Sequence, residues 1–407
     1  MLLSLPDESL LIILRFLHYK DINNVSCVNK RFQRLCKDDS LWKWQCSHYF
    51  LNSQCDKTET WYEHFVSLFS EYGRYTHYKE IRCAWDKIEK FLEKYCPTIL
   101  ASLQDGVSEG DLHAVEDHIQ HKLPEDLRLS YRIHNGQNLL AQSPGLMGGC
   151  MISTHIRTDS LVPLEEMKNS YQTEGPLAGC AFLSLDQVCK AAQLITISGQ
   201  GGFSEGYVYS FMHDPDRPSP DCFIMGSTFL EWLCDYANKL EQNSFYVAHE
   251  HIFKFYHEPG CVDGNIGITV KPTTCFIPEL SRVYPPQHFF AYRIMIEMSE
   301  DTPPDQACQL KSRFWHIKDG DGKEEEVSGP GVVGEYPVMK PGAKFAWISC
   351  STFETPTGEM KGSFKFRNLR TGIETDVPCP LFCMKAPACL TAAERREIIK
   401  ARQKENG

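Results

Sequence analysis

The spacing of hydrophobic residues changes along the 407-residue chain, and this change limits its fold more than any other feature. Before about residue 48, hydrophobic residues recur every three or four positions, which is the period of an amphipathic helix. The first such stripe is Leu10, Ile13, Leu14 and Leu17. After residue 264 they alternate, which is the period of a strand, and the stretch between mixes both periods. At roughly 100–200 residues per domain, the chain is predicted to hold several domains of different class.

Composition excludes several classes of protein. Hydrophobic residues make up 42% of the chain and charged residues 23%, which is typical of a globular protein and not of a disordered one. The net charge of −11 argues against nucleic-acid binding, because affinity for phosphates comes mainly from clustered Lys and Arg. No hydrophobic run reaches the roughly 20 residues that cross a bilayer, and no basic leader is evident. We therefore expect a protein of the nucleus and cytoplasm, without nucleic-acid or membrane partners.

Metal and cofactor sites are not indicated by the sequence. The 18 cysteines are expected to be free thiols, because disulfides belong mainly to secreted proteins. Neither a Cys-x-x-Cys pair nor a His-Glu-x-x-His motif occurs, and structural zinc usually needs four ligands in paired spacing. We predict no metal, no cofactor and, for Cys389 near the C-terminus, a surface thiol without a catalytic role.

The first 48 residues predict three short helices that are too small to form a stable core alone. Pro6 suits a first helical turn, and Asp21 and Ser40 can cap the next two helices. A lone core below about 40 residues is marginal. The core is therefore completed either by residues after 50 or by a partner protein, and the sequence leaves both possibilities open.

The same residues resemble an F-box. The resemblance rests on Leu5-Pro6, Ile13-Leu14, Asp21-Ile22, Val25-Ser26-Cys27-Val28 and Asp39-Ser40-Leu41-Trp42, in that order. It implies docking onto a Skp adaptor protein, which bridges to cullin and RING subunits. The docking residues that it implies are Leu5, Pro6, Leu10, Ile13, Leu14, Val25, Val28 and Trp42. Part of this set is expected to form the core of the F-box itself, and the sequence does not separate the two groups.

Residues 49–78 predict a helical connector, and residues 79–243 predict an α+β domain. In the second region, helical spacing gives way after about residue 190 to short strands between Gly- and Pro-rich turns. A final helix is predicted to begin at a Ser227 cap. The run Leu123-Pro124-Glu125-Asp126, followed by Asn135-Gly136, resembles the Smi/Knr domain. That resemblance implies a protein-binding module without chemistry of its own.

Residues 264–386 predict an all-β antiparallel sandwich of immunoglobulin or fibronectin type, because short strands alternate with Gly and Pro turns. The block resembles the ApaG domain. The run from Gly329 to Pro337, with sequence Gly-Pro-Gly-Val-Val-Gly-Glu-Tyr-Pro, is its most specific part. F-box, Smi/Knr-like domain and ApaG domain in this order resemble the F-box-only protein 3 family. Residues 387–407 form a short charged tail, where that family is expected to carry a long acidic one.

The pattern Gly329-x-Gly331-x-x-Gly334 is similar to a phosphate-binding loop. Such a loop needs a following helix whose N-terminus meets the phosphate. Here Pro337 prevents helix extension, and Glu335 would repel phosphate. A turn between two strands is therefore favoured. No Gly-x-Ser-x-Gly elbow occurs, and we predict a protein without catalytic residues.

These resemblances together imply a substrate-recognition subunit of a Skp–cullin–F-box ubiquitin ligase, which recruits target proteins for ubiquitination and proteasomal degradation. The candidate substrate groove consists of Trp315, Gly329, Gly331, Gly334, Glu335, Trp347, Phe353 and Thr355. Trp315 and Trp347 are explained equally well as sandwich core. Two alternatives remain open at this point: a nucleotide- or pyrophosphate-binding protein built on the ApaG block, and an F-box scaffold without ubiquitin output.

Overall fold

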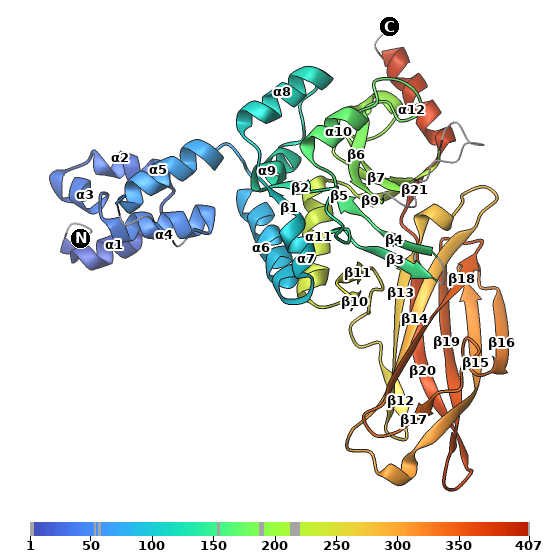
Figure 1. The fold of residues 1–407 in the computed structure, drawn as a ribbon. Helices are drawn as coiled ribbons and strands as arrows, with labels where there is room; N and C mark the ends of the chain where they lie inside the picture. Colours follow the sequence, from blue (N-terminus) through green and yellow to red (C-terminus); the bar gives the residue numbers. More distant parts are fainter. Residues whose placement is uncertain are drawn as a thin grey trace.

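A computed structural model describes residues 4–52, 54–55, 58–152, 155–186, 191–211 and 220–405. The chain forms three lobes in sequence order: an N-terminal helical lobe, a middle α+β domain and a C-terminal β-sandwich (Figure 1). Each lobe has its own large hydrophobic core. The predicted multidomain fold class is confirmed, and no described helix has the length and apolarity needed to cross a membrane.

Five α-helices are described in the N-terminal lobe. They are α1 (Asp7–Arg15), α2 (Tyr19–Ser26), α3 (Lys30–Leu35), α4 (Asp39–Phe50) and α5 (Trp61–Tyr72). Two predicted caps are wrong: the Asp38 side chain caps α4 in place of Ser40, and α2 begins after His18 in place of Asp21. One predicted helix is divided into α2 and α3, because the Asn29 side chain accepts a hydrogen bond from Phe32 N at 2.9 Å and starts a new helix.

The connector completes the core of this lobe. Phe65 of α5 is only 4% exposed and packs on Trp42 of α4, with ring centroids 4.9 Å apart. Leu10 and Leu14 of α1 join the same cluster. Of the two possibilities that the sequence left open, the structure shows residues after 50 filling this core.

Replacing Phe65 with Ala is expected to destabilise the N-terminal lobe by about 3–5 kcal/mol, because a buried ring is lost and a cavity remains. Hydrogen exchange of the α4 amides, measured by mass spectrometry, reports this lobe separately from the others. Val66 is the neighbouring residue and is 47% exposed, so Val66→Ala should leave the exchange nearly unchanged. Equal protection in wild type and Phe65→Ala would show that α5 does not support the core.

The middle domain combines helices with a six-stranded antiparallel sheet in the order β21-β9-β8-β7-β6-β5. Its helices are α6 (Tyr78–Tyr95), α7 (Pro97–Ser102), α8 (Glu109–Ile119), α9 (Glu125–Ile133), α10 (Leu164–Ser170) and α11 (Phe229–Glu241). The strands of this sheet are β5 (Ser160–Leu161), β6 (Cys180–Leu185), β7 (Ala192–Thr196), β8 (Val208–Phe211), β9 (Cys222–Gly226) and β21 (Cys389–Leu390). The predicted Ser227 cap is wrong by one residue, since Thr228 accepts the hydrogen bond from Glu231 N.

Two smaller sheets flank this arrangement. Strands β1 (Leu103–Asp105) and β2 (His134–Gln137) form a pair. A four-stranded sheet has the order β10-β11-β3-β4, with bounds β3 (Gly149–Ile152), β4 (His155–Thr158), β10 (Tyr246–Ala248) and β11 (His251–Phe253). The residues that follow α11 therefore return to the middle domain before the chain enters the sandwich.

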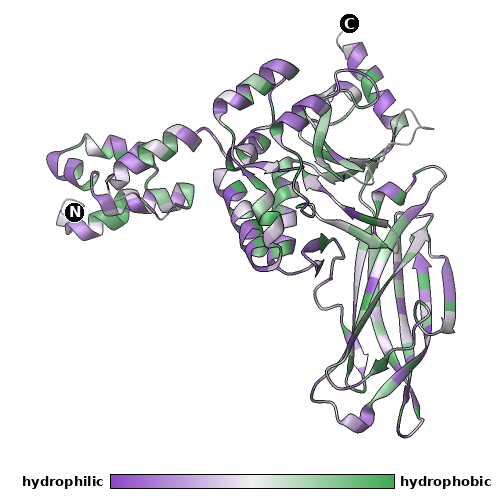
Figure 2. Cartoon of the chain, viewed as in Figure 1, coloured by the Kyte–Doolittle hydropathy of each residue, from purple (hydrophilic) through white to green (hydrophobic). Residues whose placement is uncertain are grey.

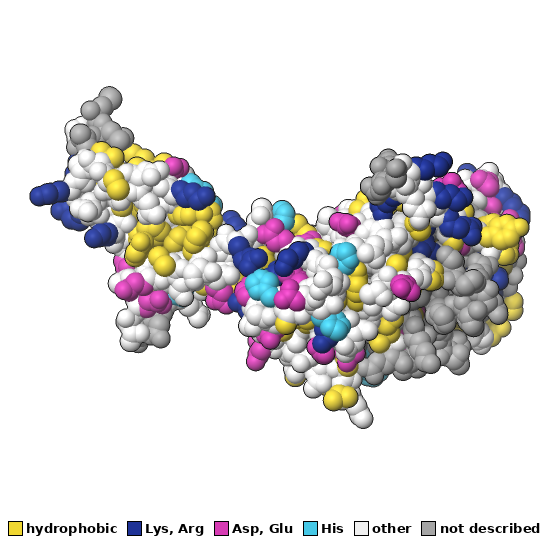
Figure 3. Space-filling model, turned by 90° about the horizontal axis from the view of Figure 1, so that it is seen from above, with side chains coloured by type: hydrophobic (Ala, Val, Ile, Leu, Met, Phe, Trp, Pro, Cys, Tyr) yellow, Lys and Arg dark blue, Asp and Glu magenta, His cyan; other side chains and the backbone are white. Residues whose placement is uncertain are grey.

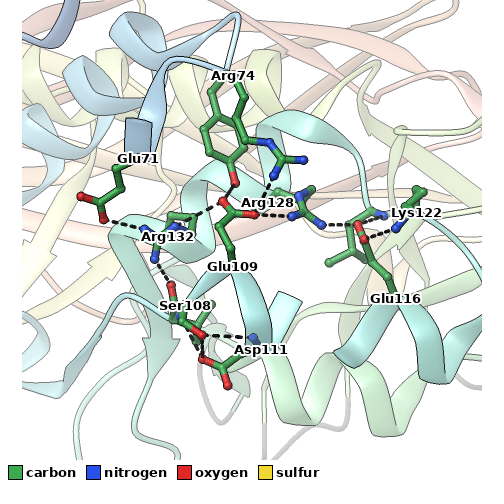
Figure 4. A network of polar contacts seen from close by, with 12 residues as sticks. Glu71, Arg74, Ser108, Glu109, Asp111, Glu116, Lys122, Arg128 and Arg132 are labelled. Atoms are coloured by element: carbon green, nitrogen blue, oxygen red, sulfur yellow. Dashed lines mark hydrogen bonds and ion pairs between the residues drawn. The ribbon is translucent and has the colours of Figure 1, made fainter. Parts of the chain in front are cut away.

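A charged network joins the N-terminal lobe to the middle domain (Figure 4). Arg132 of α9 binds Glu71 of α5 at 2.5 Å, and Arg74, just after α5, binds Glu109 of α8 at 3.1 Å. Arg128 of α9 binds the same Glu109 carboxylate at 2.6 Å. Because several charges share partners here, the network restrains the angle between the two lobes better than an isolated surface pair would.

Glu116 of α8 lies at the buried end of this network and makes the stability of the middle domain sensitive to acid. Burial raises the pKa of Glu116, but hydrogen bonds from Lys122 and Arg128 outweigh it and leave the pKa below its ordinary value of 4.5. A carboxyl with a lowered pKa stabilises the folded state above about pH 4.5, and this contribution is lost as the pH falls through the folded-state pKa.

Replacing Glu116 with Gln is therefore expected to lower the melting temperature at pH 7 and to flatten its decline between pH 5 and pH 3. Thermal unfolding across this range measures both effects. Glu165→Gln is the control, because the Glu165 side chain is 64% exposed. An acid profile of Glu116→Gln identical to that of wild type would contradict this role.

Two antiparallel sheets form the sandwich, and hydropathy alternates along their long strands (Figure 2). One sheet contains β12 (Asp263–Asn265), β13 (Ile268–Phe276), β14 (His288–Met298) and β18 (Lys344–Phe353). The other contains β15 (Cys308–Asp319), β16 (Glu324–Pro330), β17 (Val338–Met339), β19 (Thr357–Asn368) and β20 (Glu374–Lys385). Alternate residues of β14 from Phe290 to Met298 are buried, as the alternating period of a strand predicts.

A buried ion cluster fastens the middle domain to the sandwich. The Arg157 guanidinium on β4 donates two hydrogen bonds to Asp159, each of 2.6 Å, and one to Glu279 of the sandwich, also of 2.6 Å. All three residues are at most 4% exposed. Taking these charges out of water is tolerated only because each has a partner. The two domains must therefore keep the relative position that pairs Arg157 with Glu279.

The C-terminal tail returns to the middle domain. Strand β21 pairs with the edge of β9, and α12 (Ala392–Glu405) follows it. Arg395 is 3% exposed and lies over the Phe203 ring, 4.5 Å from the centroid. The expected surface thiol of Cys389 is instead half-buried in β21, and burial raises its pKa to about 12, which argues against a reactive thiolate.

Candidate functional site

The eight residues implied for adaptor docking divide into a core set and a surface set. Leu10, Leu14 and Trp42 are at most 2% exposed and belong to the core of the N-terminal lobe. Ile13 is 40% exposed and Val28 is 66% exposed. Leu5 and Val25 are half-buried, and Pro6 is exposed. The first three side chains therefore support the lobe from within and cannot form its contact surface.

Two exposed hydrophobic residues were missed by sequence reasoning. Ile12 is 54% exposed and Phe16 is 81% exposed. They are four positions apart on α1 and its C-terminal cap, so they share one helix face. Hydrophobic side chains gather on the N-terminal lobe in the face shown in Figure 3. Exposed apolar patches on a small lobe mark contact sites for other proteins.

An ion pair holds the segment before α1 in place. The Arg31 guanidinium on α3 donates to the Asp7 carboxylate at 2.7 Å and to the Leu5 carbonyl oxygen at 2.5 Å. Arg34 also reaches Asp7, at 2.5 Å. The hydrogen bond from Arg31 is the main reason that the pKa of Asp7 lies below its ordinary value. These contacts hold the Leu5-Pro6 segment against α3 at the start of α1.

The glycine loop is a tight turn between two strands. Gly329 lies near the end of β16, while Gly331 and Gly334 have φ angles of +56° and +84°, which favour glycine. The Arg313 side chain donates to the Gly331 carbonyl oxygen at 3.0 Å. After the loop, which includes Glu335, the chain continues into β17. The helix N-terminus that a phosphate-binding loop needs does not follow.

The tryptophans of the candidate groove require a correction. Trp315 is 3% exposed and Trp347 is 6% exposed, and both belong to the sandwich core. Each ring meets the Phe364 ring edge-on, with centroids 5.4 and 5.2 Å apart. They fill the space between the two sheets, so they form no part of a surface groove.

The remaining groove residues lie in two separate places. Gly329 pairs with Arg313 in the middle of β15, whereas Thr355 accepts a hydrogen bond from Gly320 N, beyond the end of β15, at 2.9 Å. Seven residues of extended strand span roughly 20 Å. Phe353 lies at the Thr355 end and borders a cleft of about 460 Å³. This cleft also contains Arg282, Lys323, Asp319 and Glu325.

One trio of possible metal ligands occurs among the described residues. The ligand atoms of Cys55, Glu59 and His64 lie within 4.8 Å of one another. His64 Nδ1 is 3.2 Å from the Glu59 carboxylate, which is an ordinary hydrogen bond. Three ligands are one fewer than a structural zinc site uses, so this trio gives no reason to assign a metal.

Two family models match parts of the chain. Residues 2–48 match the F-box-like family and residues 278–368 match the ApaG domain family. F-box only protein 3 of Bos taurus is 40% identical over 97% of this chain and 86% of its own length. Protein ApaG of Methylocella silvestris is 42% identical over 31% of this chain and 92% of its own length.

Among solved structures, the putative ApaA protein from Bordetella pertussis is 33% identical, with a TM-score of 0.28, over 31% of this chain and 96% of that protein. The Smi/Knr-like assignment of the middle domain stays a prediction. The relative from Bos taurus shares nearly the whole chain, and we conclude that the protein belongs to the F-box only protein 3 family.

Proposed function

We propose that the chain is the substrate-recognition subunit of a Skp–cullin–F-box ubiquitin ligase. The observation that carries this proposal is the exposed hydrophobic face of α1 and its cap, with Ile12, Ile13 and Phe16 between 40% and 81% exposed. The core of the lobe is already filled by residues of α1, α4 and α5, so these side chains are not needed for folding. Burying each of them in a partner would contribute about 1.5–3 kcal/mol.

In this proposal the adaptor covers the exposed face and links the chain to the cullin and RING subunits. The role of the chain itself is to position the substrate. Holding a substrate lysine beside a loaded conjugating enzyme raises its effective concentration, which accelerates transfer without a catalytic residue in the receptor. The charged network of Figure 4 and the Arg157 cluster suit this role, because they restrain the distance between the docking face and the sandwich.

The proposed substrates are proteins of the nucleus and cytoplasm that are marked for proteasomal degradation. The middle domain and the sandwich are the parts that meet them, since the N-terminal lobe is committed to the adaptor. The glycine loop does not support the alternative of a nucleotide-binding protein, because the chain continues from it into a strand and not into a helix.

Cullin association and ubiquitin transfer distinguish a ligase subunit from a scaffold. The chain, purified with the adaptor, is mixed with the cullin–RING pair, and a conjugating enzyme and ubiquitin are then added. A ligase subunit should recover cullin through the adaptor and give ubiquitin conjugates that depend on the chain. Recovery of adaptor without cullin would refute the ligase assignment and favour the scaffold.

A further inference from the structure

A cleft of about 400 Å³ lies where the middle domain meets the sandwich, and we call it the interdomain cleft. Its apolar walls include Phe245 and Tyr256 near the middle domain, and Phe276 and Phe382 of the sandwich. It has the size and apolar lining of typical ligand sites. Because both domains supply its walls, the cleft exists only while the Arg157 cluster holds the two domains together.

Lys254 is one of the charged residues that line this cleft. Its backbone N–H donates to the Gly149 carbonyl oxygen at 2.7 Å, which fixes the residue at the end of β11. The side chain is half-buried, and its ammonium lies 5.8 Å from the Tyr236 ring centroid. Lys254 also borders the small cavity that contains Arg157 and Asp159, so it connects the cleft to the buried ion cluster.

The ammonium of Lys254 lacks a counter-charge. Among the described residues no carboxylate is recorded in an ion pair with it, and both oxygens of Asp159, the carboxylate that attracts it most, are bound by Arg157. Lys239 in the same wall is paired with Asp235 at 2.7 Å. Burial lowers the pKa of Lys254. A partly buried cation without a carboxylate partner is costly, and an anion entering the cleft would reduce that cost.

The rim limits the kind of anion that fits. Lys385 and Glu258 are both exposed at the opening, so the rim adds no net positive charge. A phosphate group, with its greater charge and several oxygens, would meet the Glu258 carboxylate as well as the two lysines, Lys254 and Lys385. A single carboxylate matches the half-buried ammonium of Lys254, and the aromatic walls match an apolar neighbour.

We propose that the interdomain cleft binds an extended segment of a client protein in which Asp or Glu stands beside an aliphatic or aromatic residue. The carboxylate meets Lys254, and the apolar neighbour lies against the half-buried rings of Tyr256 and Phe276. This inference rests on the proposed function and names its substrate class: the cleft reads a short acidic–hydrophobic signal. The two domains act on it jointly, because neither contains the whole site.

A peptide array tests this inference on the full chain bound to the adaptor. The probes are heptapeptides of the form Gly-Ser-X-Glu-Z-Ser-Gly, where X and Z are Leu, Val, Phe or Tyr, each paired with the same peptide carrying Gln. The best Glu peptides should bind about tenfold more tightly than their Gln partners, as expected for a hydrogen bond between charged groups. Lys254→Met should remove this difference, and Lys361→Met, at an exposed lysine of β19, should keep it.

Equal binding of Glu and Gln peptides by the wild type would overturn the inference, and so would a preference for Glu that survives in Lys254→Met. If Lys254→Met does not fold, Lys385→Glu replaces it, because this exposed rim residue can change without loss of core contacts. It should weaken Glu peptides severalfold more than Gln peptides, and an equal effect on both would again refute the site. Failure of the adaptor complex would count against the proposed function alone, and the array is then read on the free chain.

Discussion

Phe16→Asp is expected to abolish binding of the Skp adaptor while the chain stays folded. Phe16 is 81% exposed, and the one aromatic ring described near it is that of Trp44, with centroids 6.5 Å apart. Leu10 and Leu14 keep α1 in the core, so the substitution removes nothing that folding needs. A central apolar contact is worth about 2–4 kcal/mol, and a buried unpaired carboxylate adds to the loss. The affinity should fall by about 100-fold or more.

Titration calorimetry with purified adaptor measures this change, and thermal unfolding of the free variant shows that it is folded. Leu140→Asp is the matched control, because Leu140 is 93% exposed in the middle domain. It receives the same change of side chain away from the docking face and should bind as wild type does. Unchanged affinity of Phe16→Asp would place the adaptor on another surface.

Arg157→Met is expected to give the largest loss of stability at the domain interface. The substitution leaves Asp159 and Glu279 buried without their shared cation, where Arg157 now meets both at 2.6 Å. Removing one partner of a buried pair typically costs about 3–5 kcal/mol. Glu279→Gln should cost less, since Arg157 remains bound to both oxygens of Asp159.

Thermal unfolding and limited proteolysis between residues 254 and 267 report this interface. Arg157→Met should melt earlier and be cut faster in that segment, with Glu279→Gln between it and the wild type. The double variant should lose less stability than the two single variants lose in total. The reason is that the second change removes one of the carboxylates that Arg157→Met leaves unpaired. Additive losses would mean that Arg157 and Glu279 act independently.

The sequence predicts the class of each lobe because hydrophobic period is a local signal. The alternation along β14 gives both the strand and its buried face. It does not say whether Trp315 and Trp347 face a core or a groove, because an aromatic groove and a sandwich core present the same residue types. Only the packing of the two sheets, which places the Phe364 ring of one sheet against Trp315 beside it and against Trp347 of the other sheet, decides this.

The docking face shows a second limit of pattern reading. Leu10 and Leu14 are buried, while Ile12, Ile13 and Phe16 on the same short helix are exposed. A face that binds a partner is as hydrophobic as a face that fills a core, so hydropathy does not separate them. The separation needs the positions of α3 and α4, against which α1 packs.

Contacts between distant parts of the chain leave no periodic trace. Arg157 and Glu279 are 122 positions apart, and the tail residue Arg395 lies over Phe203. From sequence alone the tail is a charged segment, since a buried arginine looks like an exposed one. The interdomain cleft depends on the same long-range docking, and sequence reasoning therefore did not find it.

The central claim is that this chain docks onto a Skp adaptor through an already folded N-terminal lobe. Co-expression of the two proteins, followed by size-exclusion chromatography with light scattering, tests it most directly. The proposal predicts a complex whose mass equals 46.6 kDa plus one adaptor, and loss of that complex in Phe16→Asp. Elution of folded wild-type chain at 46.6 kDa, with the adaptor in a separate peak, would contradict it.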